Sequence, residues 1–117
     1  MKYMLLVYLD EQVLSEEERK QCYVESAQLT QDLNSRGQYL GAGPLHPVST
    51  ATSVRLRDGK RLVTDGPFAE TREQLGGYML IDAEDLDAAI GIAARVPGAR
   101  MGTVEVRTVR EGPPTAP

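Results

Sequence analysis

The chain has few of the residues on which many functional sites depend. Its 117 residues include one cysteine, one histidine, one phenylalanine and no tryptophan. The single cysteine, Cys22, excludes an internal disulfide and a thiolate cluster for zinc, and it suits a reducing compartment. The single histidine, His46, excludes a multi-histidine metal site within one chain, and its neighbours Leu45 and Pro47 offer no side-chain ligand. We therefore expect no permanent metal at His46 and no cofactor.

Long apolar runs and an excess of positive charge are missing as well. The apolar run near the N-terminus, Met4 to Leu9, is too short for a signal-peptide core or a transmembrane helix. With 13 basic and 17 acidic side chains the net charge is −4, so the whole chain does not attract phosphate or anionic lipid. We expect neither nucleic acid nor membrane as a partner, and a cytoplasmic protein.

The first third of the chain reads as strand, helix and strand. Lys2 to Leu9 is apolar and rich in β-favouring residues, which predicts a central first strand. Ser15 stands three residues before Glu18, the spacing of a capping box, and it predicts the start of a helix. Gly37 predicts the end of that helix, and Tyr39 to Gly43 predicts a second strand.

The middle of the chain contains the clearest hairpin pattern. Apolar and charged residues alternate on both sides of Asp58-Gly59, a pair that favours a type I′ turn. Two interpretations of its cations stay open: they hold an anion, or they form a solvated outer face, which we favour. These cations are Arg55, Arg57, Lys60 and Arg61.

The last third repeats the strand and helix pattern in shorter form. Gly76 to Ile81 predicts a strand, and Asp82 predicts the cap of a second helix that ends at Pro97-Gly98. Thr103 to Val109 predicts a final strand with one wet face. The apolar stripe expected on the second helix consists of Leu86, Ala89, Ile90 and Ala93.

This order of elements predicts an α+β fold of the ferredoxin-like type, a split βαβ plan with an inserted β-hairpin. We expect a single domain over residues 1–110 and a disordered C-terminal tail over residues 111–117. Both helices fall on one face of the sheet, so the other face is left bare. Pairing of two such faces in a homodimer would cover it, and we expect a dimer.

The most unusual stretch runs from Asp65 to Tyr78, with the sequence DGPFAETREQLGGY. Asp65-Gly66-Pro67 is typical of a turn, in which the aspartate accepts backbone N–H bonds. A second interpretation makes Asp65 a general acid or base with Glu70 or His46 as its partner. In that interpretation the side chains of Thr71 and Tyr78 bind a ligand.

Two residues of this stretch, Phe68 and Asp65, are interpreted as structural. Phe68, the only phenylalanine, is interpreted as an anchor that fixes the loop onto the core. We favour the structural role of Asp65 over the catalytic one, because its neighbours Gly66 and Pro67 are turn-forming residues.

The run LVTDGPFAETREQLGGY resembles the signature of the YCII-related proteins, in particular the branch named after its DGPF motif. The likeness extends from the MKYMLLVY start through GAGPLHP and TSVRLRDG to GTVEVRTV. It implies a ferredoxin-like protomer in a dimeric α/β barrel, and genes often linked to extracytoplasmic-function sigma factors. A His-Asp pair is suggested as the active site in related proteins; here the first helix has no histidine, and Ser26 stands near the expected position.

Two function classes stay open. In the first, the protein is a small cofactor-free enzyme or small-molecule-binding protein with a pocket near the DGPF motif. In the second, it is a non-catalytic regulatory or accessory dimer that uses the Arg-rich hairpin to meet a protein partner. We favour the first, because a polar, glycine-bearing motif that joins two strands inside a barrel gains little from being a mere surface.

Overall fold

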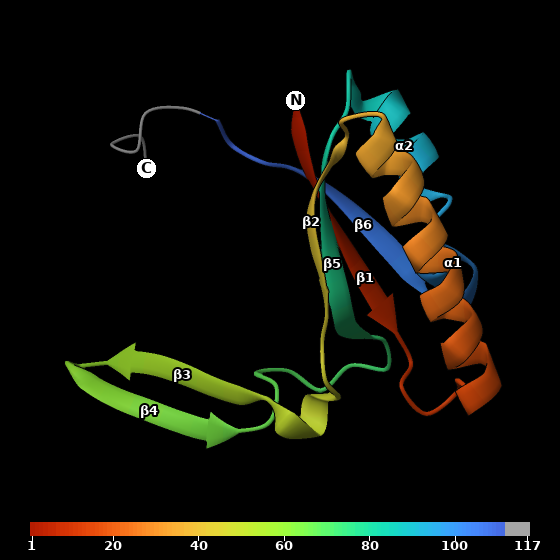
Figure 1. Cartoon of the computed structure of the whole chain (residues 1–117). Coiled ribbons are helices and arrows are strands. Elements are labelled where there is room, and N and C mark those ends of the chain that lie inside the picture. Colours follow the sequence, from red (N-terminus) through yellow and green to blue (C-terminus); the bar gives the residue numbers. More distant parts are fainter. Residues whose placement is uncertain (112–117) are drawn as a thin grey trace.

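A four-stranded antiparallel sheet forms the centre of the molecule (Figure 1). The computed structural model describes residues 1–111, and the expected disorder of the tail therefore falls almost entirely outside the described residues. The sheet has the strand order β2-β5-β1-β6. These strands are β1 (Lys2–Leu9), β2 (Tyr39–Pro44), β5 (Gln74–Asp82) and β6 (Thr103–Thr108).

The sheet topology confirms the ferredoxin-like plan. Strand β1 lies inside the sheet and pairs antiparallel with both β5 and β6, as expected for a central first strand. Helix α1 (Glu16–Ser35) connects β1 to β2, and α2 (Leu86–Ala93) with the short α3 (Gly98–Met101) connects β5 to β6. The 3₁₀ turn η1 (Val48–Thr50) and the hairpin of β3 (Thr52–Arg57) and β4 (Lys60–Asp65) are inserted between β2 and β5.

The helix boundaries follow from local capping interactions. The Ser15 hydroxyl accepts a hydrogen bond from the Glu18 amide while the Glu18 carboxylate accepts one from the Ser15 amide, which confirms the predicted capping box. Helix α1 ends before Gly37, whose φ of 72° lies in the left-handed region that glycine tolerates. The predicted cap of α2 is wrong by three residues: Asp85, not Asp82, accepts from the Ala88 amide, because β5 continues through Asp82.

The core lies between the helices and one face of the sheet. Leu29 and Leu33 of α1 pack over Tyr3, Leu5 and Ile81 of the sheet, and all five side chains are buried. On α2 the buried residues are Ala89, Ile92 and Ala93. Two members of the expected stripe, Leu86 and Ile90, are instead about half exposed, because the short helix α2 turns toward the sheet through its small residues.

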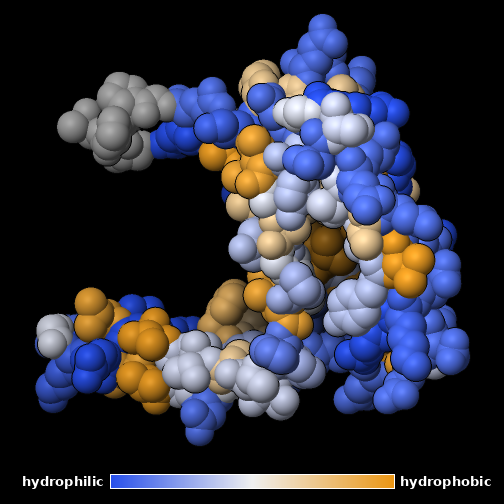
Figure 2. All heavy atoms as spheres, viewed as in Figure 1, coloured by the Kyte–Doolittle hydropathy of each residue, from blue (hydrophilic) through white to orange (hydrophobic). Residues whose placement is uncertain are grey.

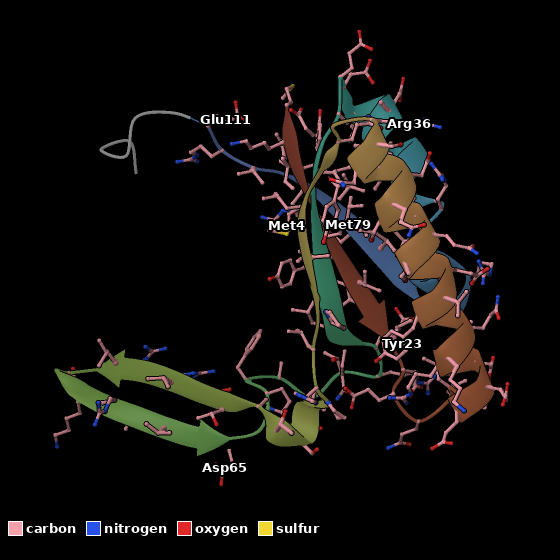
Figure 3. The ribbon with its side chains drawn as sticks, in the orientation of Figure 1. Met4, Tyr23, Arg36, Asp65, Met79 and Glu111 are labelled. Atoms are coloured by element: carbon pink, nitrogen blue, oxygen red, sulfur yellow. The ribbon has the colours of Figure 1, made fainter. Side chains whose placement is uncertain are left out.

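The opposite face of the sheet is uncovered in the single chain (Figure 1). Along β1 and β5 the side chains on this face alternate with the buried ones. They include two cross-strand pairs, Met4 with Leu80 and Leu6 with Tyr78. Figure 3 shows Met4 on this open side and Met79 on the helix side. The valines of β6 do not lie here, since Val104 and Val106 pack against the core.

The β3-β4 hairpin, here called the arm, projects away from the body (Figure 1). Asp58 and Gly59 at its tip have φ values of 52° and 73°, as a type I′ turn requires. Every residue of β3 and β4 is exposed except Ser53. Phe68, beside the arm, is 80% exposed, so the expectation that it anchors the loop onto the core is wrong for the single chain.

Candidate functional site

A cavity of about 650 Å³ lies between helix α1 and the helix-facing side of the sheet. Figure 2 shows the surface hollowed there, with apolar residues at the bottom of the depression. This volume is within the range of about 300–1,000 Å³ that small-molecule sites occupy. Much of its apolar wall comes from the sheet, the β2 to η1 connection and the segment before α3: Val7, Leu9, Leu45, Pro47, Met79, Val96 and Pro97.

Helix α1 supplies a polar stripe to the same cavity. Arg19, Cys22, Ser26 and Thr30 line it and recur at spacings of three and four residues, so they share one face of the helix. The buried Leu29 and Leu33 hold the C-terminal half of α1 against the sheet. Helix α1 therefore has a packed face with Leu29 and Leu33 and, beside it, a polar stripe that borders the cavity.

Two ion pairs hold α1 to the segment between α2 and β6. Arg95 Nη1 lies 2.8 Å from the Asp32 carboxylate as an ion pair, and Arg100 donates to the Glu25 carboxylate at 2.6 Å. The Arg95 guanidinium beside it lowers the pKa of Asp32 from its ordinary value, and Arg36 lowers it further. These contacts position the polar stripe of α1 opposite the sheet.

Cys22 lies in the stripe as a half-buried thiol. Its Sγ is 3.3 Å from Sδ of Met101. Burial raises the pKa of Cys22 above its ordinary value, and the nearby carboxylate of Glu25 raises it further. The thiol is therefore protonated at neutral pH, which agrees with a packing role and disfavours a nucleophile.

The connection from β2 to the arm forms the outer wall of the cavity. The Glu11 carboxylate accepts a hydrogen bond from the Val48 amide at 3.0 Å and ties this connection to the end of β1. Pro44 at the end of β2 lines the cavity with Leu45 and Pro47 of the connection, while His46 is exposed and does not. Gly77 lies close to the same wall, since a Cβ there would be 3.1 Å from the Gly43 carbonyl oxygen.

Most of the predicted site residues lie away from the cavity. Asp65 ends β4 with an exposed side chain that points into solvent in Figure 3, and Glu70 and Thr71 are exposed in the loop that follows. The Thr71 hydroxyl donates to the Glu73 carbonyl oxygen at 2.8 Å, so it closes its own loop. Of the predicted residues only Tyr78 borders the cavity, and its side chain lies on the open face of the sheet, with the ring over Gly43.

The turn at Asp65 is held by backbone groups and not by the aspartate side chain. The Gly66 amide donates to the Ala51 carbonyl oxygen at 2.7 Å, and the Ser53 hydroxyl donates to the Gly66 carbonyl oxygen at 2.7 Å. Within residues 1–111, no hydrogen bond to the Asp65 carboxylate accompanies them. The glycine, with a φ of 98°, is the residue that this turn requires.

Reasoning from the sequence missed the polar stripe of α1 as a site. The sequence marks Ser26 only as the residue near the expected histidine, and nothing in it marks Arg19 or Thr30 as ligand contacts. The available signal was the low apolar content of the helix before Leu29, where Arg19, Cys22 and Ser26 carry guanidinium, thiol and hydroxyl groups.

The chain matches the YCII-related domain family over residues 1–112. It belongs to the YCII-related family. A relative within reach of direct sequence comparison is an uncharacterized protein of Rhizobium meliloti strain 1021, 38% identical over 116 residues, which cover 92% of this chain and 90% of that protein. Family membership confirms the resemblance to the YCII-related proteins.

A solved structure with the same fold is that of 5-chloro-2-hydroxyhydroquinone dehydrochlorinase from Burkholderia phenoliruptrix AC1100 in complex with 2,5-dihydroxybenzoquinone. The TM-score is 0.57, and the match covers 96% of both chains at 13% sequence identity. At this identity the likeness supports the fold of the YCII-related chain and not its chemistry. Among the helices described for residues 1–111, none is long and apolar enough to cross a membrane.

Proposed function

We propose that the protein is a small cofactor-free enzyme or small-molecule-binding protein whose site is the cavity between α1 and the sheet. The observation that carries this proposal is the cavity itself: about 650 Å³, with an apolar wall and a polar stripe that faces it. A pocket of this kind binds a ligand through apolar contact and orients it with a few polar groups.

The composition of the wall favours a ring-sized organic ligand with polar substituents. The hydroxyls of Ser26 and Thr30 offer both donors and acceptors, and Arg19 supplies a cation at one end of the stripe. Tyr39, which packs partly into the core, adds a further hydroxyl to the lining. The structural neighbour holds a dihydroxybenzoquinone, a molecule of this size and polarity, which guides the choice of probes.

The acid and base roles of Asp65 and His46 are a separate part of the proposal. Both side chains are exposed, and a single chain does not bring either of them into the cavity. If they act in chemistry, they act in the assembled protein or after movement of the exposed loops. Glu11 also lines the cavity, and its carboxylate is already engaged by the Val48 amide.

A binding screen tests the role of the cavity directly. Isothermal titration calorimetry with 2,5-dihydroxybenzoquinone, hydroquinone and small aromatic acids should give at least one saturable binder of the parent chain. Ser26→Phe places a ring inside the cavity and should abolish that binding. Gln28→Phe on the same helix is the matched control, because Gln28 is exposed and does not line the cavity.

Two results would contradict the cavity proposal. One is that none of these probes binds or raises the melting temperature of the folded parent chain. The other is that Ser26→Phe binds a probe as tightly as Gln28→Phe does, which would place the ligand elsewhere.

The alternative is a regulatory or accessory module of the DGPF branch, linked to extracytoplasmic-function sigma-factor systems. The observation that favours it is the arm, which exposes apolar side chains beside four cations. Such a surface is typical of a protein-binding element. A chain that binds no small molecule but is retained by a protein partner through the arm would support this alternative.

We also propose that two chains pair through the open faces of their sheets, as in a dimeric α/β barrel. Met4, Leu6 and Leu80 lie on that face in the single chain, where they would otherwise meet water. Tyr8 and Glu105 add one polar pair, with the Tyr8 hydroxyl 3.1 Å from the Glu105 carboxylate. Burial and then this hydrogen bond raise the pKa of Tyr8, so its hydroxyl stays protonated and donates.

A further inference from the structure

The single chain has more surface than a compact domain of its size. Its accessible surface is 8393 Å², whereas a folded monomer of 12.8 kDa is expected to have roughly 6,300 Å². Its radius of gyration is 16.2 Å, against about 13.4 Å for a compact chain of this length. The excess area is larger than the roughly 800 Å² that each partner of a typical interface buries.

Four large apolar side chains of the arm are exposed: Val54, Leu56, Leu62 and Val63. Cross-strand pairs share a face, so Val54 with its partner Val63, and Leu56 with Arg61, occupy one side of the arm. Val54, Leu56 and Val63 are 59%, 68% and 59% exposed. A two-stranded hairpin is at best marginally stable in water without a covering layer, so the arm needs a partner.

The direction and the length of the arm identify the partner. Figure 1 and Figure 2 show the arm projecting on the open side of the sheet, away from α1 and α2. Its strands have six residues each and are therefore about 20 Å long, whereas stacked sheets lie about 10 Å apart. A second sheet laid on the open face would lie within reach of the arm.

Charge favours the same partner. Residues 52–65 contain Arg55, Arg57, Lys60 and Arg61 against Asp58 and Asp65, a net charge of +2. Since the whole chain carries −4, the remainder carries −6. A basic arm is therefore attracted to the acidic body of another copy.

We propose that the arm of each chain packs its Val54, Leu56 and Val63 side against a second copy of the same chain. This inference rests on the proposed pairing of the open faces and adds to it a second contact, made by the inserted hairpin. It gives the DGPF motif a physical role, because Gly66 and Pro67 form the turn through which the chain leaves the arm.

The base of the arm is continuous with the cavity wall. The connection that supplies Leu45 and Pro47 to the cavity leads through η1 directly into β3. A second copy that holds the arm would therefore also fix this wall. We expect ligand affinity at the cavity to fall when the arm is released, even though no arm residue lines the cavity.

Sedimentation of the full chain and its variants at micromolar concentration tests the inference. The parent should sediment as a dimer, and Leu56→Glu should raise the dimer dissociation constant by at least about tenfold. Thr64→Glu is the matched control, since it adds the same charge to an exposed position on the other side of the arm. It should leave the dissociation constant within about threefold of the parent.

Deletion of the arm distinguishes loss of the arm contact from misfolding of a point variant. The Ala51 carbonyl and the Gly66 amide are already 2.7 Å apart, so a Gly-Gly link can replace residues 52–65. The shortened chain should keep its helical circular dichroism signal and unfold in one cooperative transition, because the arm contributes nothing to the core. It should dissociate at least as readily as Leu56→Glu.

The outcomes separate the two proposals. If the parent sediments as a monomer, both the pairing of the open faces and the arm contact are overturned, and the partner of the arm is then a different protein. If Leu80→Glu on the open face breaks the dimer while the folded, arm-deleted chain dimerises as tightly as the parent, only the arm inference is overturned. Equal weakening by Leu56→Glu and Thr64→Glu also overturns it, because the effect would then follow charge and not the apolar side.

Discussion

The body and the arm use the same apolar residue types in opposite settings. Leu5, Leu33 and Ile81 of the body have no exposed surface, whereas Val54 and Leu56 of the arm are more than half exposed. Both regions show the alternation that defines a strand, so the pattern alone does not tell which strands are covered. The difference comes from the helices, which cover one face of the four-stranded sheet and leave the arm alone.

The largest expected effect on stability comes from shortening a buried side chain in the body. Leu33→Ala should lower the free energy of unfolding by about 2–5 kcal/mol, because it leaves a cavity beneath α1. Leu56→Ala in the arm should change it by no more than about 0.5 kcal/mol in the monomer. Urea unfolding at low protein concentration measures both, and similar losses for the two variants would contradict the division into body and arm.

Two glycines of the body compare a crowded backbone position with an open one. A Cβ at Gly102 would collide with the backbone carbonyl of Tyr8, whereas a Cβ at Gly91 in helix α2 meets nothing within 4 Å. Gly102→Ala should therefore cost about 1–3 kcal/mol of stability. Gly91→Ala should add up to about 1 kcal/mol, because alanine favours a helix. Thermal unfolding checks the two signs, and a stabilised Gly102→Ala would refute the close approach.

The sequence predicted those parts of the fold that local chemistry determines. The capping box at Ser15, the glycine stop at Gly37 and the type I′ turn at Asp58-Gly59 each require particular residues at particular spacings, and the structure confirms all three. The misplaced cap of α2 shows the limit. Asp82 and Asp85 are equally good caps, and only the pairing of Asp82 with Lys2 across the sheet keeps it in β5.

The candidate site was less predictable because it depends on packing between distant elements. The cavity is enclosed by α1, by the β2 to η1 connection and by the segment before α3, which lie far apart in the sequence. A motif such as Asp65 to Tyr78 is conspicuous in sequence, yet most of it forms an exposed loop. Ser26 and Thr30 are inconspicuous residues, and they face the cavity only because Leu29 and Leu33 fix the helix above it.

A smaller effect is expected from the ion pair that holds α1. Since the pKa of Asp32 is lowered in the folded protein, its charge stabilises the fold above the ordinary aspartate value of 3.8, and this contribution is lost as the pH falls through the lowered value. Asp32→Asn should therefore lower the melting temperature at neutral pH and match the parent in acid. An Arg95→Gln background should reduce the effect, and a difference that persists in acid would contradict the ion-pair origin.

The smallest effect is expected at Asp65, although this residue stands at the head of the most conspicuous motif. If its carboxylate accepted buried N–H groups, Asp65→Ala would cost about 1–3 kcal/mol and Asp65→Asn much less. The exposed side chain and the backbone hydrogen bonds at Gly66 predict instead that both variants stay within about 0.5 kcal/mol of the parent monomer. Unfolding below the dimer dissociation constant measures this, and an alanine-specific loss would restore the structural role. A loss of ligand turnover in Asp65→Asn with normal stability would instead establish the acid–base role, since that change removes the charge and keeps the size.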